Sequence, residues 1–308
     1  MKKAILFYHC LTPLHNGAGS DIGLIDRPII RERTTKLPFV QATSVKGVLR
    51  AEATAVDKGK ARLAFGDDDA KGSKHQGFAD VDDAGMLALP IRSLKGGFVW
   101  ATTDLLLMRL QRAVSEVGGS LAGLDQAIEA AAKLKEGQIL VTPAAQPKLE
   151  VSMGDKKMVF LEEYGYQATA SQPLEQLAQA LAPLAIGEPS FRDAFAERLC
   201  LLPRDSLLYF AQFATELQAN IKIDADSGTT TGGSLRYTEY LPQEAMLMGR
   251  LATRDVTYRN GSNALSTAGD VFDFVAGIID DNPHRFGADQ TTGKGITHVR
   301  RYSGQEEA

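Results

Sequence analysis

Several features that often reveal a protein's class are scarce or missing in this sequence. Only two cysteines occur in 308 residues, Cys10 and Cys200, and both lie outside any CxxC or Cys/His cluster. We therefore expect buried thiols rather than a zinc site or a disulfide framework. No run of eighteen apolar residues occurs, so the sequence predicts no membrane span and no membrane partner.

The N-terminal residues resemble a signal peptide only in outline. Two lysines precede a short apolar run in MKKAILFYHCLTPLH, but His9 and Thr12 interrupt that run. No small-residue cleavage site follows it, as a signal peptide would require. We expect this segment to form a first strand, and the protein to be cytoplasmic.

An overall basic charge is also missing, since the formal net charge is −4 and the isoelectric point is about 5.8. Taken alone, this argues against a nucleic-acid-binding protein, because such proteins usually carry a basic surface. Charge acts locally, however. Residues 27–50 hold six basic residues and one acid, and residues 284–302 hold four basic residues and one acid. Two interpretations stay open: a random mixture of charges, or a basic groove built from the two ends of the chain.

The order of the expected elements indicates an α+β protein. A strand near the N-terminus, a helix that Ser44 is placed to cap, two strands within 77–93 and a helix within 101–117 follow one another. This is the start of a ferredoxin-like unit. We expect one elaborated domain over 1–308, with a hairpin at 219–241 and insertions at 56–78 and 120–200.

Two glycine-rich loops, GAGSDIG and GADQTTGKGI, match neither common nucleotide-binding pattern. The second has five residues where a P-loop has four between its glycines, and the first lacks the lysine and hydroxyl residue. Neither has the strand-to-helix context of a Rossmann fingerprint. An ATPase or a dehydrogenase is therefore disfavoured. What remains is two loops beside basic residues, which suit either close approach of phosphate or ordinary tight turns.

Five segments occur in an order that is specific to one family. They are LTPLHNGAGSDIGLIDRPIIRER, SVKGVLR, GMLALPIRSLKGGFVWATTDLLLMRL, SLRYTEYLP and TTGKGI, and they span Leu11 to Ile296. In these segments the sequence resembles the RAMP superfamily. More closely, it resembles the Cas-seven-like backbone subunits (the fourth-named Cmr subunit) of type III-B CRISPR effector complexes.

This resemblance implies a ferredoxin-like (RRM-like) palm with helical fingers and a protruding β-hairpin thumb. It implies head-to-tail stacking with further copies into an open filament on a guide crRNA. Complementary target RNA would pair with the guide and be cut at regular intervals, with Mg²⁺ or Mn²⁺ as cofactor. The other Cmr-complex subunits, including the large polymerase-like subunit and the small subunit, would be further partners.

The resemblance also assigns roles to individual residues. Asp26 occupies the family's catalytic position, where a carboxylate can hold a metal ion or position the attacking 2′-hydroxyl. Without the resemblance, an aspartate just before Pro28 would be read as a turn residue. His15 is a candidate acid, base or phosphate contact, or a loop-ordering residue. Glu239 matches a family glutamate that assists the metal or orients Arg236.

We expect the RNA backbone to meet glycines and basic residues. Lys46 and Arg50 lie four apart, so they share one face of the expected helix near its phosphate-favouring N-terminus. The expected RNA-binding residues are Gly17, Gly19, Arg27, Arg31, Ser44, Lys46, Gly47, Arg50, Gly293, Lys294 and Gly295.

Two alternatives from other classes stay open. One alternative is an RNA-binding filament subunit without an active site. The other is a guide-processing RAMP endonuclease that works without metal through a histidine base. The presence of Asp26 favours target cleavage over a purely structural subunit, and cleavage in EDTA would favour the guide-processing endonuclease.

Overall fold

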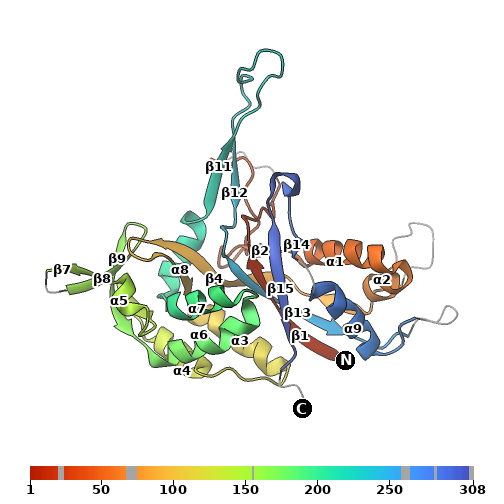
Figure 1. Cartoon of the computed structure of the whole chain (residues 1–308), viewed down its shortest axis with the longest axis horizontal. Coiled ribbons are helices and arrows are strands. Elements are labelled where there is room, and N and C mark those ends of the chain that lie inside the picture. The colour runs from red at the N-terminus through yellow and green to blue at the C-terminus, as the bar shows by residue number, and fades with distance from the viewer. Residues whose placement is uncertain (20–23, 67–74, 155, 258–263, 281–282, 305–308) are drawn as a thin grey trace.

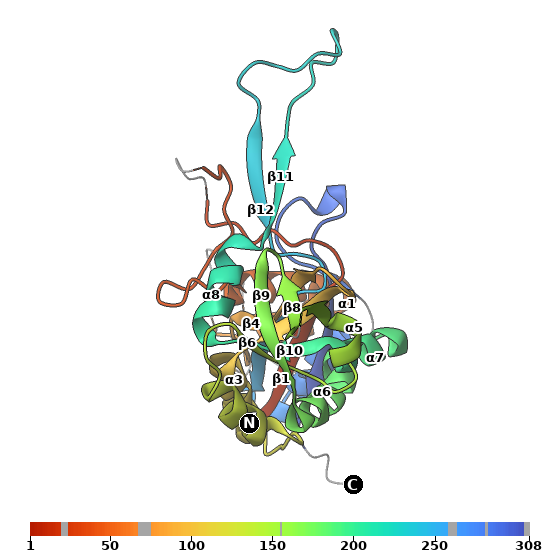
Figure 2. The same ribbon diagram turned by 90° about the vertical axis from the view of Figure 1, so that its left-hand side faces the viewer.

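The computed structural model describes residues 1–19, 24–66, 75–154, 156–257, 264–280 and 283–304. It confirms the α+β class. Within these ranges the strands form a 13-stranded mixed sheet and a separate two-stranded hairpin. Helices pack on both faces of the large sheet, and the hairpin stands away from the body (Figures 1 and 2).

One part of the large sheet belongs to a βαββαβ unit. Its strands lie in the order β15-β1-β13-β4, each antiparallel to its neighbour. Helix α1 follows β1, and helix α9 lies between β13 and β15. The elements of this region are β1 (Lys2–Cys10), β2 (Phe39–Val40), α1 (Ala42–Val56), α2 (Lys58–Phe65), β3 (Ala79–Val81), β4 (Ala84–Ser93), β13 (Met246–Thr253), α9 (Ala268–Ile279), β14 (His284–Arg285), η1 (Gln290–Thr292) and β15 (Ile296–Tyr302).

The sequence of β1 explains why this strand lies in the middle. Its even-numbered residues from Ala4 to Cys10 pack on one face with α1 and α9, while Ile5 and Phe7 pack on the other with α3 and α6. Because successive side chains of a strand point to opposite faces, a nearly continuous apolar run is buried on both sides. Cys10 and Cys200 are free and buried, as expected, and burial raises the pKa of the Cys10 thiol to about 12.

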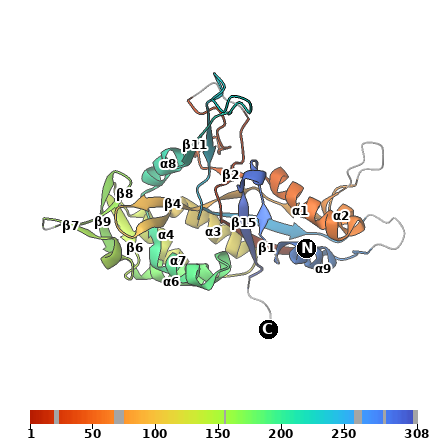
Figure 3. The same ribbon diagram turned by 45° about the horizontal axis from the view of Figure 1, so that its top comes forward.

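The middle of the chain extends the sheet rather than forming a separate helical lobe. Strand β10 pairs in parallel with β5, and β6, β9, β8 and β7 continue outward from it. The elements of this region are β5 (Gly97–Thr102), α3 (Asp104–Glu116), α4 (Leu124–Ala132), β6 (Gln138–Val141), α5 (Gln146–Leu149), β7 (Val151–Met153), β8 (Lys156–Leu161), β9 (Tyr164–Ala170), α6 (Gln172–Ala185), α7 (Pro189–Arg198), β10 (Leu199–Leu201) and α8 (Arg204–Phe213). Figure 3 shows this region at one end of the body and α1, α2 and α9 at the other.

The expected hairpin consists of β11 (Glu216–Asn220) and β12 (Arg236–Tyr240), which pair only with each other among the described strands. Helix α1 begins three residues earlier than a Ser44 cap would place it, after Gln41, which provides no side-chain cap. Ser44 is not the cap, because its hydroxyl donates a hydrogen bond to Asn16 Oδ1 at 3.2 Å. Within the described residues, none of the helices has the length and apolar character that a bilayer crossing requires.

Candidate nucleic-acid interface and active site

A groove of about 780 Å³ lies at the foot of the hairpin. Four parts of the chain form it: the loop between β1 and β2, the start of α1, the first residue of β12, and the glycine loop before β15. Seven of the residues singled out in the sequence line this groove, namely His15, Gly17, Gly19, Asp26, Arg27, Ser44 and Gly47. Residues far apart in the sequence therefore meet around one concave surface.

Backbone hydrogen bonds fix the relative positions of the groove's walls. Leu14 and Leu241 exchange two of them, at 2.9 and 2.8 Å, so the first loop is joined to the end of the hairpin. The Ala288 N–H donates to the carbonyl of His15 at 2.9 Å, so the same loop is joined to the glycine loop. Gly287 is required there, because its φ is +77° and a Cβ would lie 2.2 Å from the His15 carbonyl oxygen.

Asp26 is held against the beginning of β12, the second strand of the hairpin. The Tyr237 N–H donates to Asp26 Oδ2 at 2.7 Å, and the backbone of Arg27 forms an isolated parallel β-bridge with Thr238. Asp26 Oδ1 accepts no hydrogen bond from any residue that the structure describes. One oxygen of this carboxylate is thus anchored, while the other is available to a ligand in the groove.

His15 is 3% exposed. Its Nδ1 lies 2.7 Å from the carbonyl oxygen of Glu239, and because a carbonyl only accepts, Nδ1 must carry the proton. In the neutral ring Nε2 is then an unprotonated acceptor. Nε2 points toward Gly17, where a Cβ would lie 2.6 Å away. Tyr240 packs on the ring edge to face, with 5.6 Å between centroids, which fixes the ring's orientation.

Glu239 lies beneath the groove rather than in it, and it is 2% exposed. Its Oε2 accepts from the Ile29 N–H at 3.0 Å, and its Oε1 accepts from Thr215 Oγ1 at 2.7 Å and from the Arg31 guanidinium. Both carboxylate oxygens are therefore occupied by protein donors. This geometry favours a structural role, in which Glu239 orients the loop that carries Asp26, over direct contact with a metal ion.

Arg31, expected to bind RNA, is turned inward by that ion pair. Its guanidinium also donates to the carbonyls of Ala211 at 2.5 Å and Lys36 at 2.9 Å. An arginine that satisfies three protein acceptors is a poor phosphate ligand. Lys46 and Arg50 lie on α1 but are absent from the residues that line the groove, which receives Thr43, Ser44, Gly47 and Val48 instead.

The C-terminal glycine loop lines the groove with other residues than those expected. Gly287, Ala288 and Gln290 line the groove, whereas Gly293, Lys294 and Gly295 do not. Gly295 has φ +76°, and a Cβ there would lie 2.0 Å from the Phe286 carbonyl oxygen, so its role is structural. The Lys294 ammonium lies 4.9 Å from the Tyr240 ring centroid.

A polar network joins this loop to Arg27. The Arg27 guanidinium lies 3.3 Å from Asp289 Oδ2, and the Tyr240 hydroxyl donates to the same oxygen at 2.9 Å. Burial, and then this bond to Asp289, raise the pKa of Tyr240 to about 12, so the phenol stays protonated. Arg27 is therefore a groove cation whose position is set by a carboxylate from the other end of the chain.

Seven residues that line the groove were not among the expected site residues, namely Asn16, Thr43, Val48, Arg236, Gly287, Ala288 and Gln290. Asn16 is 6% exposed, donates to the Phe39 carbonyl at 3.3 Å and accepts from Ser44. It joins the first loop to α1. Its place directly after His15 was the available signal, while Gln290 carries no pattern that sets it apart from a loop glutamine.

The residues present fit a divalent metal ion only in a shared site. Within the described ranges, no group of three or more His, Cys, Asp or Glu side chains is arranged to hold a metal. Asp26 supplies the single carboxylate among the described residues lining the groove. Mg²⁺ commonly binds through one or two carboxylates, water and substrate phosphates. Asp26 therefore suits an ion held jointly by the protein and RNA.

Comparison with known proteins places this fold and groove in a family. The RAMP superfamily model matches residues 7–298, and the chain belongs to that superfamily. A curated relative, the CRISPR system Cmr endoribonuclease Cmr4 of Pyrococcus furiosus, is 31% identical over 97% of this chain and 95% of its own length. The chain is thus a member of the Cmr4 family within the RAMP superfamily.

Solved structures share the same fold. Oligomeric Cmr4 from Pyrococcus furiosus is 24% identical, with a TM-score of 0.65 over 98% of both chains. A chain of the type III-B Cmr-beta complex bound to cognate target RNA is 19% identical, with a TM-score of 0.72 over 98% of this chain and 97% of that one. At these identities the likeness concerns the fold.

Proposed function

We propose that this protein is the repeating, guide-binding subunit of a CRISPR Cmr complex and that it cleaves target RNA paired with the guide. The proposal rests on the Cmr4 relative, named as an endoribonuclease, and on one observation in this chain. Asp26 presents a carboxylate oxygen that accepts no hydrogen bond from the described residues, in a groove that His15 also lines.

The parts of the fold then acquire functions. The βαββαβ unit is the ferredoxin-like palm, and the hairpin of β11 and β12 is the thumb that separates successive segments of the duplex. Copies of the chain stack head to tail on one guide, because a heterologous interface that does not close gives an open filament. The large and small Cmr subunits complete the complex. Guide contacts are to backbone and shape, since one subunit must accept any sequence.

The groove supports cleavage of the target strand by attack of a ribose hydroxyl on the neighbouring phosphate. The 2′-hydroxyl attacks the adjacent phosphorus and gives its proton to His15 Nε2, the 5′-oxygen leaves with a proton from solvent, and a cyclic phosphate remains. Asp26 orients the reacting ribose and phosphate. Asp26, together with RNA oxygens, would hold Mg²⁺ or Mn²⁺, and such an ion would stabilise the negative charge that develops on the phosphate. Arg27 and Arg236, which both line the groove, neutralise neighbouring phosphates.

Asp26→Asn in the assembled complex tests this proposal. The amide retains an oxygen that can accept from Tyr237, so the loop keeps its position while the carboxylate charge is removed. We expect target binding to be unchanged and the regularly spaced cleavage products of labelled target RNA to disappear. Asp273→Asn, which makes the same change on the exposed face of α9, is the matched control.

Three outcomes would contradict parts of the proposal. Unchanged cleavage by Asp26→Asn in the presence of Mg²⁺ would remove Asp26 from the active site. Cleavage by the unaltered complex in EDTA would indicate metal-free chemistry by a histidine base. A complex that binds target but never cuts it would identify a subunit with only a structural role.

A further inference from the structure

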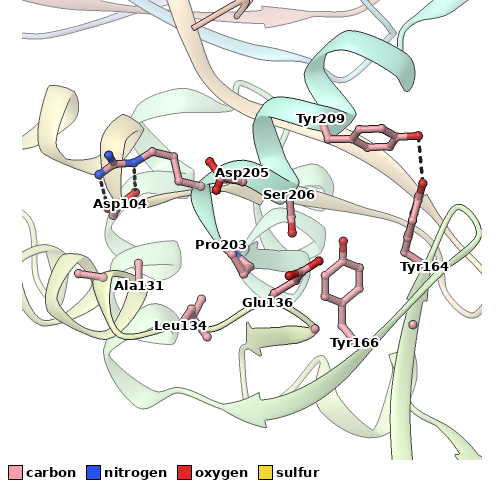
Figure 4. A pocket seen from close by; sticks show the side chains of 14 residues that line it. Asp104, Ala131, Leu134, Glu136, Tyr164, Tyr166, Pro203, Asp205, Ser206 and Tyr209 are labelled. Atoms are coloured by element: carbon pink, nitrogen blue, oxygen red, sulfur yellow. Dashed lines mark hydrogen bonds and ion pairs between the residues drawn. The ribbon is translucent and has the colours of Figure 1, made fainter.

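A second large cavity lies in the middle region of the chain and shares no lining residue with the groove. Its volume is about 770 Å³. It is formed by the first turns of α8, by β9, by the end of α4 and by the turn that precedes β6 (Figure 4). Because none of the roles described above uses this cavity, its lining has to be explained separately.

Three tyrosines form one side of the cavity: Tyr164 and Tyr166 from β9, and Tyr209 from α8 (Figure 4). The Tyr164 hydroxyl donates to the Tyr209 hydroxyl at 3.0 Å, and their rings meet edge to face with centroids 5.5 Å apart. All three rings pack around the buried Phe210, at centroid distances of 5.8 to 6.4 Å. The tyrosine wall is therefore rigid.

This wall is also accessible. Tyr164 is 40% exposed and Tyr209 is 39% exposed. The hydrogen bond with Tyr209 raises the pKa of Tyr164 to about 12. The Tyr164 phenol therefore stays neutral near physiological pH, and the rings of both tyrosines present the negative faces that attract cations.

The charged groups around the wall leave an excess of negative charge. Asp104 is neutralised by Arg204, through bonds from Nε to Oδ1 at 3.1 Å and from Nη2 to Oδ2 at 2.6 Å. Glu136 and Asp205 also line the cavity, and neither forms a hydrogen bond or ion pair with any residue that the structure describes. The cavity thus carries a formal charge of −2, from one cation and three carboxylates.

The negative charge of this cavity disfavours phosphate, the ligand proposed for the groove. A phosphate would meet two unpaired carboxylates, and although α8 begins here, Asp205 in its first turn already complements the partial positive charge of the helix N-terminus. Aromatic faces beside carboxylates bind guanidinium and ammonium groups. The shape is also suitable, because a planar guanidinium can lie on a tyrosine ring while it donates to a carboxylate.

We propose that this cavity is a binding site for an organic cation, a guanidinium or alkylammonium group held between the tyrosine wall and the carboxylates of Glu136 and Asp205. The cation is either the side chain of an arginine or lysine from another protein, or a free polyamine. The inference does not depend on the RNA-cleaving function, since the two cavities have no residue in common.

The test uses the purified full-length chain and isothermal titration with two probes of the same shape. N-butylguanidinium carries the charge, and N-butylurea replaces it with a neutral group. We expect saturable binding of the cation, binding of the urea at least tenfold weaker, and loss of affinity with added salt. Glu136→Gln and Asp205→Asn should each weaken cation binding at least threefold. Asp273→Asn, which changes the net charge by the same amount on α9, should leave it unchanged.

Tyr209→Leu removes an aromatic face and should also weaken cation binding at least threefold. The thermal unfolding of this variant is recorded to verify that it folds. Two further probes identify the source of the cation. Tighter binding of N-acetylarginine methylamide than of spermidine assigns the site to a protein side chain, and the reverse order assigns it to a polyamine. Equal affinity for the cation and the urea would overturn the proposal, as would undiminished cation binding by both carboxamide variants. RNA cleavage by the Asp205→Asn complex should be normal.

Discussion

Replacing Glu239 with glutamine distinguishes a structural glutamate from a catalytic one. The carboxylate is 2% exposed and accepts hydrogen bonds on both oxygens, from Ile29, Thr215 and Arg31. Glutamine has nearly the same volume but only one accepting oxygen. Whichever way the amide is turned, its NH₂ group faces a donor, and the Arg31 guanidinium loses its counter-charge.

The expected cost follows from these contacts. Breaking a buried ion pair by removing one partner costs about 3 to 5 kcal/mol, and the amide recovers part of this through its remaining oxygen. We expect Glu239→Gln to lower the free energy of unfolding by about 3 kcal/mol. For a chain of this size the melting temperature should fall by roughly 5 °C. Urea unfolding followed by circular dichroism measures the first quantity, and a thermal scan measures the second.

A matched control and a cleavage assay complete the experiment. Glu162→Gln makes the same change in an exposed ion pair with Arg92, and should cost less than about 1 kcal/mol. Well below its melting temperature, a complex containing Glu239→Gln should still cut target RNA, at a reduced rate. Full stability combined with abolished cleavage would refute the structural role and restore Glu239 to the chemistry.

Three more predictions follow from the same contacts. Gly47→Glu places a charged side chain in open space in the groove and should weaken guide-RNA retention, whereas Gly47→Ala should retain RNA and raise stability by about 0.5 to 1 kcal/mol. Gly287→Ala should lower the melting temperature more than Gly293→Ala, because both have positive φ but only the first would clash with backbone. Burial alone would raise the pKa of Asp104, but its hydrogen bonds with Arg204 lower it, so its contribution to stability is present above about pH 3.9. The stability difference from Asp104→Asn should therefore shrink as the pH falls below that value.

Local patterns in the sequence were sufficient for much of the fold. The apolar run in Lys2–Cys10, the long helix after Thr103 and the glycine-rich tip of the hairpin each determine structure over a few neighbouring residues. The continuation of the sheet was not predictable in this way. Strand β10 has three residues and β6 has four, and segments so short become strands only through partners far away in the sequence.

The candidate site shows the same division. The glycine loop was evident from its composition, whereas Asp26 was assigned by the resemblance to the RAMP superfamily, because an aspartate before Pro28 by itself indicates a turn. The choice between Arg27 and Arg31 was not evident, because the two differ only in what lies beside them: Asp289 for the first and the buried Glu239 for the second. Both partners are more than 200 positions away, so spacing in the sequence carries no information about which arginine faces RNA.

The groove's construction also has a consequence for synthesis on the ribosome. His15 is translated more than 250 residues before Ala288, whose N–H binds the His15 carbonyl, and β15 beyond Ala288 pairs with β1. The nascent chain therefore cannot present a finished groove until Ala288 and β15 have emerged from the ribosome. Until then, a growing polypeptide close to abundant ribosomal and messenger RNA is without its RNA-cutting surface.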